Sequence, residues 1–171
     1  MQYEPWLQKK FDFDFPITEL PKILDRLSAT ITKVEELVNG LSEKQLINKP
    51  NGKWSIKEHI GHLSDLEELN DNRIDDFKNK MLNLRAADLE NNKTEKAEHN
   101  KRSIKDIIDT FKNTRNYFII RLKGLSDAEL SRAAIHPRLQ KKMRPVDMAL
   151  FVAEHDDHHL MLIQNIIEGI K

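Results

Sequence analysis

The sequence predicts an all-α protein, a four-helix bundle with an extended N-terminal arm and a long crossover between its second and third helices. Two observations support this fold class. Four separate segments repeat apolar residues at helical spacing, and the 171 residues include five glycines and six prolines, fewer than a fold of many strands and turns requires. The length fits a single domain, residues 1–171.

The arm and the first helix form the N-terminal part of this fold. In residues 11–16 (FDFDFP) aromatic and acidic residues alternate, which is typical of an extended segment that packs one face on the protein. The first helix is expected from Thr18, a candidate N-cap with Pro21 in the first turn, to Val38, where residues 39–40 (NG) end it. Its core positions are Ile23, Leu24, Leu27, Ile31, Val34, Leu37 and Val38.

The second helix and the crossover follow. Ser55 and Glu58 have the spacing of a capping box, in which each side chain binds the backbone N–H of the other residue. The apolar pattern continues from there to about residue 80. Residues 85–102 are nearly devoid of apolar positions, and a compact domain accommodates so long a connection where it is functional, partly helical or mobile.

The third and fourth helices complete the bundle. The third is expected to begin after Ser103 and to end at Gly124. A basic loop over residues 136–144 is expected next, and Pro145 suits the first position of a last helix that runs to about Ile170.

Composition excludes several classes of function. Lys+Arg and Asp+Glu balance at 28 each, so no global positive field favours nucleic acid as a partner. The absence of cysteine excludes disulfides, thiolate metal sites and a cysteine nucleophile in the chain itself. No secretion signal and no apolar run of membrane-spanning length is evident, which predicts a cytoplasmic protein with no membrane contact.

Two histidines on the last helix are the main candidates for chemistry. His155 and His159 fall within an apolar arc of roughly 100° on a helical projection. The arc also contains Met148, Val152, Leu162, Ile163 and Ile166. Two imidazoles one turn apart on a buried face either bond to polar groups in the core or bind a metal together, and the residues alone leave both explanations open.

A third metal ligand would come from the second helix, which offers His59 and His62. The helical projection places His59 nearer the centre of the apolar face and weakly favours it. His99 and His136 fall in predicted loops, where His99 is expected to be solvated. His158 is expected on the flank of the last helix.

Three parts of the chain together form a recognisable pattern: residues 52–65 (GKWSIKEHIGHLSD), the pair 136–137 (HP) and residues 155–160 (HDDHHL). This pattern resembles the DinB/YfiT-like superfamily, and the resemblance covers essentially the whole chain. In that family, a histidine eight residues after a tryptophan joins a His-x-x-x-His pair on the last helix to bind a divalent metal. The resemblance therefore implies the ligands His62, His155 and His159, and a four-helix bundle that is often dimeric.

The resemblance also implies a chemistry. Characterised relatives use bacillithiol, mycothiol or glutathione, so we expect a bacterial enzyme that transfers a low-molecular-weight thiol to an electrophilic small molecule with the help of zinc or nickel. Two other classes remain open: a metal-dependent hydrolase, and a stress-related protein that binds a metal or ligand without turnover. The catalytic residues beyond the metal ligands are not identified by the sequence.

Three features near the expected site are left undecided by the sequence. Gln140 departs from the His-Pro-x-Leu-Gly pattern that many members show. Asp65 either orients an imidazole or is an exposed acid. The basic residues between Arg138 and Arg144 either hold an anionic thiol cofactor or are solvated.

Overall fold

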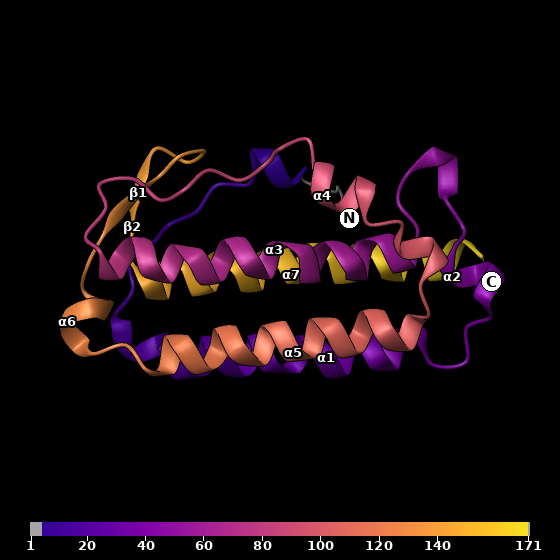
Figure 1. Ribbon diagram of the computed structural model, residues 1–171, viewed down its shortest axis with the longest axis horizontal. Coiled ribbons are helices and arrows are strands. Elements are labelled where there is room, and N and C mark those ends of the chain that lie inside the picture. Colours follow the sequence, from indigo (N-terminus) through magenta and orange to yellow (C-terminus); the bar gives the residue numbers. More distant parts are fainter. Residues whose placement is uncertain (1–4, 171) are drawn as a thin grey trace.

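Four long helices pack side by side, as the sequence predicts (Figure 1). The computed structural model describes residues 5–170. The helices are α1 (Leu20–Val38), α3 (Ile56–Lys78), α5 (Ile104–Lys123) and α7 (Pro145–Gly169). The capping box of Ser55 and Glu58, the N-cap Ser103 and the first-turn Pro145 are all present where expected. None of the helices in residues 5–170 combines the length and apolarity that a membrane span needs.

The order of the helices in space explains the long crossover. Each helix packs against two others: α3 lies beside α5 and α7, and α1 also lies beside α5 and α7. The neighbours α3 and α5 run in the same direction (Figure 1), so residues 79–103 must travel back along the whole bundle before α5 begins. This segment contains α4 (Asn92–Lys96) and a 3-10 turn, η4 (His99–Lys101), and is therefore partly helical.

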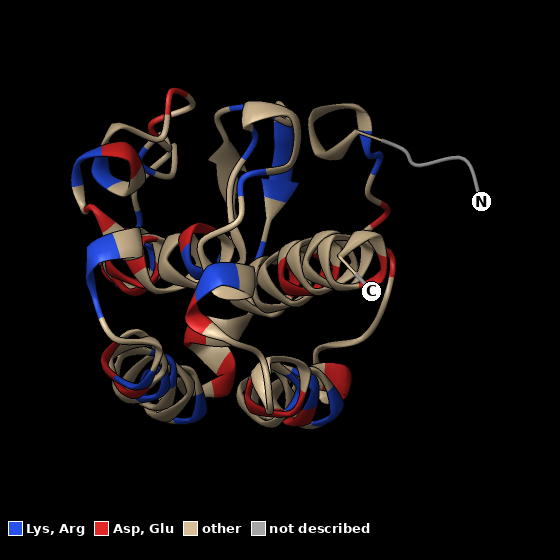
Figure 2. Ribbon diagram, turned by 90° about the vertical axis from the view of Figure 1, so that its right-hand side faces the viewer, with Lys and Arg blue, Asp and Glu red and all other residues tan. Residues whose placement is uncertain are grey.

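The crossover and the arm form a third layer with a small hairpin, above α3 and α7 (Figure 2). The arm contains the 3-10 turns η1 (Trp6–Gln8) and η2 (Ile17–Glu19). The hairpin consists of antiparallel β1 (Ala134–His136) and β2 (Lys141–Met143). The remaining short elements are α2 (Glu43–Leu46), η3 (Pro50–Gly52) and α6 (Asp127–Leu130).

Two local expectations were wrong. The segment 136–144 is not an irregular loop, because a turn with Gln140 at a positive φ of 53° brings two three-residue strands together; strands this short give no periodic signal. Thr18 does not cap α1: the chain enters through η2, and Glu19 takes the N-cap position without a side-chain hydrogen bond.

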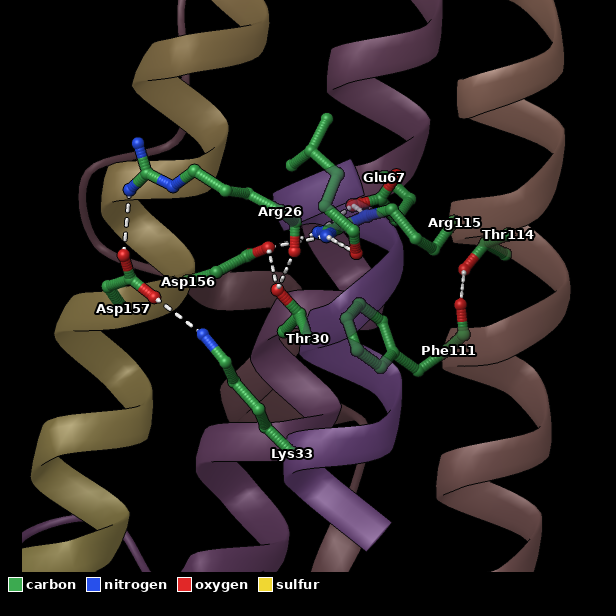
Figure 3. Close-up of polar contacts among 10 residues, drawn as sticks. Arg26, Thr30, Lys33, Glu67, Phe111, Thr114, Arg115, Asp156 and Asp157 are labelled. Atoms are coloured by element: carbon green, nitrogen blue, oxygen red, sulfur yellow. Dashed lines mark hydrogen bonds and ion pairs between the residues drawn. The ribbon is translucent and has the colours of Figure 1, made fainter. Parts of the chain in front are cut away.

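A buried polar layer divides the core into two apolar clusters. At its centre the guanidinium of Arg115 on α5, fully buried, donates to Glu67 of α3 at 2.7 and 2.9 Å and to Asp156 of α7 (Figure 3). Thr30 of α1 also donates to Asp156, at 2.9 Å, and Arg115 reaches the Leu27 carbonyl. One side chain therefore connects all four helices.

Replacing Arg115 tests this connection. Arg115→Met should lower the free energy of unfolding by about 3–5 kcal/mol, because it leaves two carboxylates buried without their cation. Urea denaturation followed by circular dichroism measures the change. The matched control is Arg26→Met, since Arg26 also binds two carboxylates, Glu154 and Asp157, but at the surface; its loss should be about 1 kcal/mol or less. Equal losses in both variants would contradict the assignment.

Candidate metal centre

Three histidines converge between α3 and α7 on the side of the third layer. His62 of α3 and His155 and His159 of α7 each place a ring nitrogen within 4.8 Å of the others. The Nε2 atoms of His155 and His159 lie 3.2 Å apart. All three side chains are buried. The residues that the family resemblance selects are thus brought together in a geometry that a single metal ion fits.

Burial keeps these imidazoles neutral. It lowers the pKa of His62 to about 4, although the carboxylate of Asp65 acts in the opposite direction. It lowers the pKa values of His155 and His159 well below the usual 6.5, and the neighbouring histidines add to the effect. A neutral imidazole has the lone pair that a metal ligand requires.

A hydrogen-bond relay from the crossover fixes the ring of His62. Thr94 Oγ1 lies 3.0 Å from Asp65 Oδ2 and 3.0 Å from His62 Nδ1. A carboxylate only accepts, so the Thr94 hydroxyl donates to Asp65 and accepts the Nδ1–H of His62. The proton of His62 is therefore held on Nδ1, and Nε2 is left with its lone pair. Asp65 acts through Thr94 and not by direct contact with the imidazole.

His59 lies behind the cluster, against one of its ligands. It is buried, as the helical projection indicates, but its Nδ1 lies 2.9 Å from Nδ1 of His159. His59 thus contacts the ring nitrogen of His159 that faces away from His155. If His159 presents Nε2 to a metal, its Nδ1–H donates to His59. The weak preference of the projection for His59 over His62 as a ligand does not agree with this geometry.

His99 is not solvated, contrary to expectation. Its side chain is 1% exposed, and its Nε2 donates to Asp65 Oδ2 at 2.8 Å. The ring lies over Gly61 of α3, where a Cβ atom would come within 2.4 Å of it. Glycine at 61 and the carboxylate of Asp65 therefore dock the polar crossover onto α3, which a sequence pattern based on apolar residues does not reveal.

The remaining histidines lie nearby. His136 in β1 is buried, and its Nδ1 accepts the backbone N–H of Leu139 at 3.2 Å. Burial, with Arg73 and Arg138 close by, lowers its pKa to about 3. His158 is half-buried on the flank of α7, where its ring packs against Trp6 and His159.

A cavity of about 390 Å³ opens over the three histidines. Helices α3 and α7 line one side of it, and the arm, crossover and hairpin line the other. Its apolar walls include Trp6, Leu7, Trp54, Leu66, Leu69 and Phe151. Trp6 and Leu7 belong to η1, which precedes the alternating segment 11–16 that the sequence indicated as packing, and no residue of that segment belongs to the lining. A cavity of this size suits a small molecule.

The basic residues of the hairpin separate into two groups. Arg138 lines the cavity. Lys141 instead binds the Phe11 carbonyl at 2.7 Å, and Arg144 binds Asp147 and the arm. Lys142 is exposed. A second arginine of the cavity, Arg73 of α3, was missed by the sequence analysis, because an arginine within an amphipathic helix is normally assigned to its solvated face.

The fold and the site define a helical-bundle protein with a buried three-histidine cluster beside a small-molecule cavity. The sequence model of the DinB superfamily matches residues 26–163, and the chain belongs to this superfamily. Among solved structures, the chain is similar to YfiT from Bacillus subtilis, described as a probable metal-dependent hydrolase with an unusual four-helix bundle topology. The two share 18% sequence identity with a TM-score of 0.80, over 95% of this chain and 93% of YfiT. No protein of curated function matches the sequence.

The relay to His62 can be tested through metal affinity. Thr94→Val removes the hydroxyl but keeps the shape, so the Nδ1 proton of His62 loses its acceptor and zinc affinity should fall roughly 10–100-fold. Competition with a chromophoric chelator measures the affinity. The control is Thr114→Val, since Thr114 bonds only backbone carbonyls of its own helix. Unchanged affinity in Thr94→Val would show that the relay does not orient the ligand.

Buried His136 predicts a pH-dependent stability of the metal-free protein. Its pKa is about 3 when folded and about 6.5 when unfolded, so the unfolded chain binds more protons between these values. The stability that neutral His136 contributes is fully present above about pH 6.5 and is lost progressively as the pH falls below that value. Urea midpoints between about pH 7 and pH 5 should therefore decline less steeply in His136→Gln than in the wild type. Urea midpoints that decline equally in the variant and the wild type would contradict the lowered pKa of His136.

Proposed function

We propose that this protein is a metal-dependent enzyme that transfers a low-molecular-weight thiol to an electrophilic small molecule. The observation that carries the proposal is the convergence of His62, His155 and His159 beside a cavity large enough for a small ligand. Three protein ligands leave a coordination position for a substrate, whereas a structural zinc site uses four.

The donor set fits zinc or nickel, since imidazole suits both ions. Three neutral ligands leave the full divalent charge uncompensated, and a metal so held lowers the pKa of a thiol that reaches it. The chain's own contribution is to keep the three imidazoles neutral by burial, to hold the His62 proton on Nδ1 through Thr94, and to place His59 against His159. With no cysteine in the chain, the sulfur must come from a cosubstrate.

Hydrolysis is the second candidate, favoured by the likeness to YfiT. It requires a general base beside the reacting water. The acidic residue that lines the cavity, Asp88, already accepts the backbone N–H groups of Glu90 and Asn92. The accepting nitrogen of His136 is already bonded to Leu139. Because these contacts hold both groups toward the backbone of their own loops, we propose thiol transfer as the reaction to test first.

The third candidate is a non-catalytic protein that binds a metal or ligand, for example in a stress response. The measurement of metal content and thiol transfer described below also tests it. It differs from both enzymes in showing metal binding without turnover. Homodimer formation, zinc or nickel as the physiological ion, and a cytoplasmic location remain predictions of the sequence.

Metal content and thiol transfer together test the proposal. Untagged protein should contain about one equivalent of divalent metal by plasma mass spectrometry, and His62→Ala and His155→Ala should both lose it, because two ligands bind a metal far more weakly than three. His158→Ala, on the flank, should retain it. The loaded protein should then consume a thiol with an electrophile such as monobromobimane faster than the metal-free protein.

Two outcomes would contradict the proposal. Absence of metal even after reconstitution with zinc or nickel would make the histidines a polar network of the core. Hydrolysis of a test ester at the same rate with and without added thiol would favour the hydrolase.

A further inference from the structure

Two arginines line the cavity without a carboxylate partner. Arg73 is 2% exposed, and its Nε and Nη2 donate to the backbone carbonyl of Arg85 at 3.1 and 3.0 Å. Arg138 donates from Nη1 to the Leu7 carbonyl at 3.1 Å, while its Nη2 is buried with no hydrogen-bond partner in residues 5–170. Both belong to the lining of the same cavity. The fully buried Arg115, by contrast, binds two carboxylates.

The acidic groups near these arginines form their hydrogen bonds with other residues. Asp76, one turn from Arg73 on α3, binds the side chain and the backbone N–H of Arg85 at 2.8 and 2.9 Å. Asp88 accepts from its own loop. Neither carboxylate forms an ion pair with Arg73 or Arg138 in the described part of the chain.

Two neighbouring cations that lack a directly bonded carboxylate are electrostatically costly where water is largely excluded. The rings of Trp6 and Phe151, 5.5 and 5.4 Å from the Arg138 guanidinium carbon, offset part of this cost. Burial lowers the pKa of Arg73 to about 10, although the Asp76 carboxylate acts in the opposite direction, and the cations Arg85 and Arg138 add to the lowering. Burial also lowers the pKa of Arg138. Both remain cations at neutral pH, so the free protein holds two like charges around one cavity. An anion entering the cavity would relieve this repulsion.

The neighbouring side chain adds a neutral donor. Because His136 Nδ1 accepts from Leu139, its proton is on Nε2. His136 and Asn70 line the cavity together with the two arginines. Guanidinium forks and an N–H donor are the groups that bind an oxyanion such as a carboxylate or a phosphate.

Arg73 and the histidine cluster lie at different places along one helix face, whereas Arg138 lies in the turn between β1 and β2. His62 and Arg73 are eleven residues apart on α3, which is about three turns and a Cα separation of about 16 Å. Leu66 and Leu69 line the cavity between them. A ligand that reaches both ends is therefore elongated, with an apolar middle.

We propose that Arg73, about three turns of α3 from His62, and Arg138 of the hairpin form an oxyanion subsite in the cavity, and that this subsite binds an anionic oxygen group of the thiol substrate. This inference rests on the proposed function, because it assumes that the thiol end of the ligand binds the metal. The subsite selects thiols that carry a carboxylate or phosphate several bonds from the sulfur. The neutral apolar middle of the ligand contacts Leu66 and Leu69.

The test uses matched thiols and a spectroscopic readout. Protein loaded with Co²⁺ is titrated with 6-mercaptohexanoate and with neutral 6-mercaptohexanol, and thiolate binding is followed by the sulfur-to-cobalt charge-transfer absorption. The anionic thiol should bind at least about tenfold more tightly, a difference of about 1.4 kcal/mol. The preference should fall to about twofold or less in Arg73→Met and in Arg138→Met, which keep much of the apolar stem. Lys142→Met removes an exposed charge of the same hairpin and should keep the preference.

A second titration separates this inference from the proposed function. Hexanoate and hexyl phosphate, which lack sulfur, are titrated calorimetrically into the metal-free protein. Binding that is lost in Arg73→Met or Arg138→Met supports the subsite. The ligand that binds more tightly identifies the preferred oxyanion. If neither thiol yields the absorption band, the thiol-transfer proposal fails while this titration still decides the subsite. Equal affinity for both thiols, or oxyanion binding unchanged in both folded arginine variants, would overturn the subsite.

Discussion

The guanidinium of Arg115 is the interaction on which the arrangement of the bundle depends. It joins Glu67 of α3, Asp156 of α7 and the Leu27 carbonyl of α1 from its own position on α5. Apolar surfaces alone tolerate small rotations and slips of a helix, whereas a buried charge must find its partner at a fixed position. Asp156 directly follows His155, and successive helical residues differ by about 100°. When Asp156 is held toward the core, His155 and His159 are directed toward α3 and the cavity.

The topology of the bundle supplies the rest of the site. Because α3 and α5 run in the same direction, the connection between them must return along the bundle, and it does so over the face formed by α3 and α7. The returning chain places Thr94 against His62 and His99 against Gly61. A short connection between antiparallel helices would leave this face uncovered. The crossover therefore serves both as a link and as the wall of the cavity.

The sequence predicted the parts that depend on local signals. Helix boundaries followed from Ser55, Ser103 and Pro145, since caps and prolines act within one turn. The pair His155 and His159 followed from its place in an apolar arc, and the choice of His62 came from the family resemblance. Contacts between segments far apart in the sequence could not be predicted from these local signals. The burial of His99 depends on a glycine on a different helix, Gly61 of α3, and Arg73 became part of a cavity because the crossover covers it.

The contrast between Arg115 and Arg73 indicates how buried charge is used in this fold. Both guanidinium groups are almost completely enclosed. Arg115 has two carboxylates, which raise its pKa despite burial, and its surroundings are completed by the chain itself. Arg73 hydrogen-bonds a backbone carbonyl and no carboxylate among the described residues, burial lowers its pKa although Asp76 acts in the opposite direction, and it borders open space. A protein retains a buried cation without a bonded carboxylate at a cost to stability, and this cost is recovered where a ligand completes the charge balance. The stabilising arginine and the arginine available to a ligand thus differ in their partners, although their burial is the same.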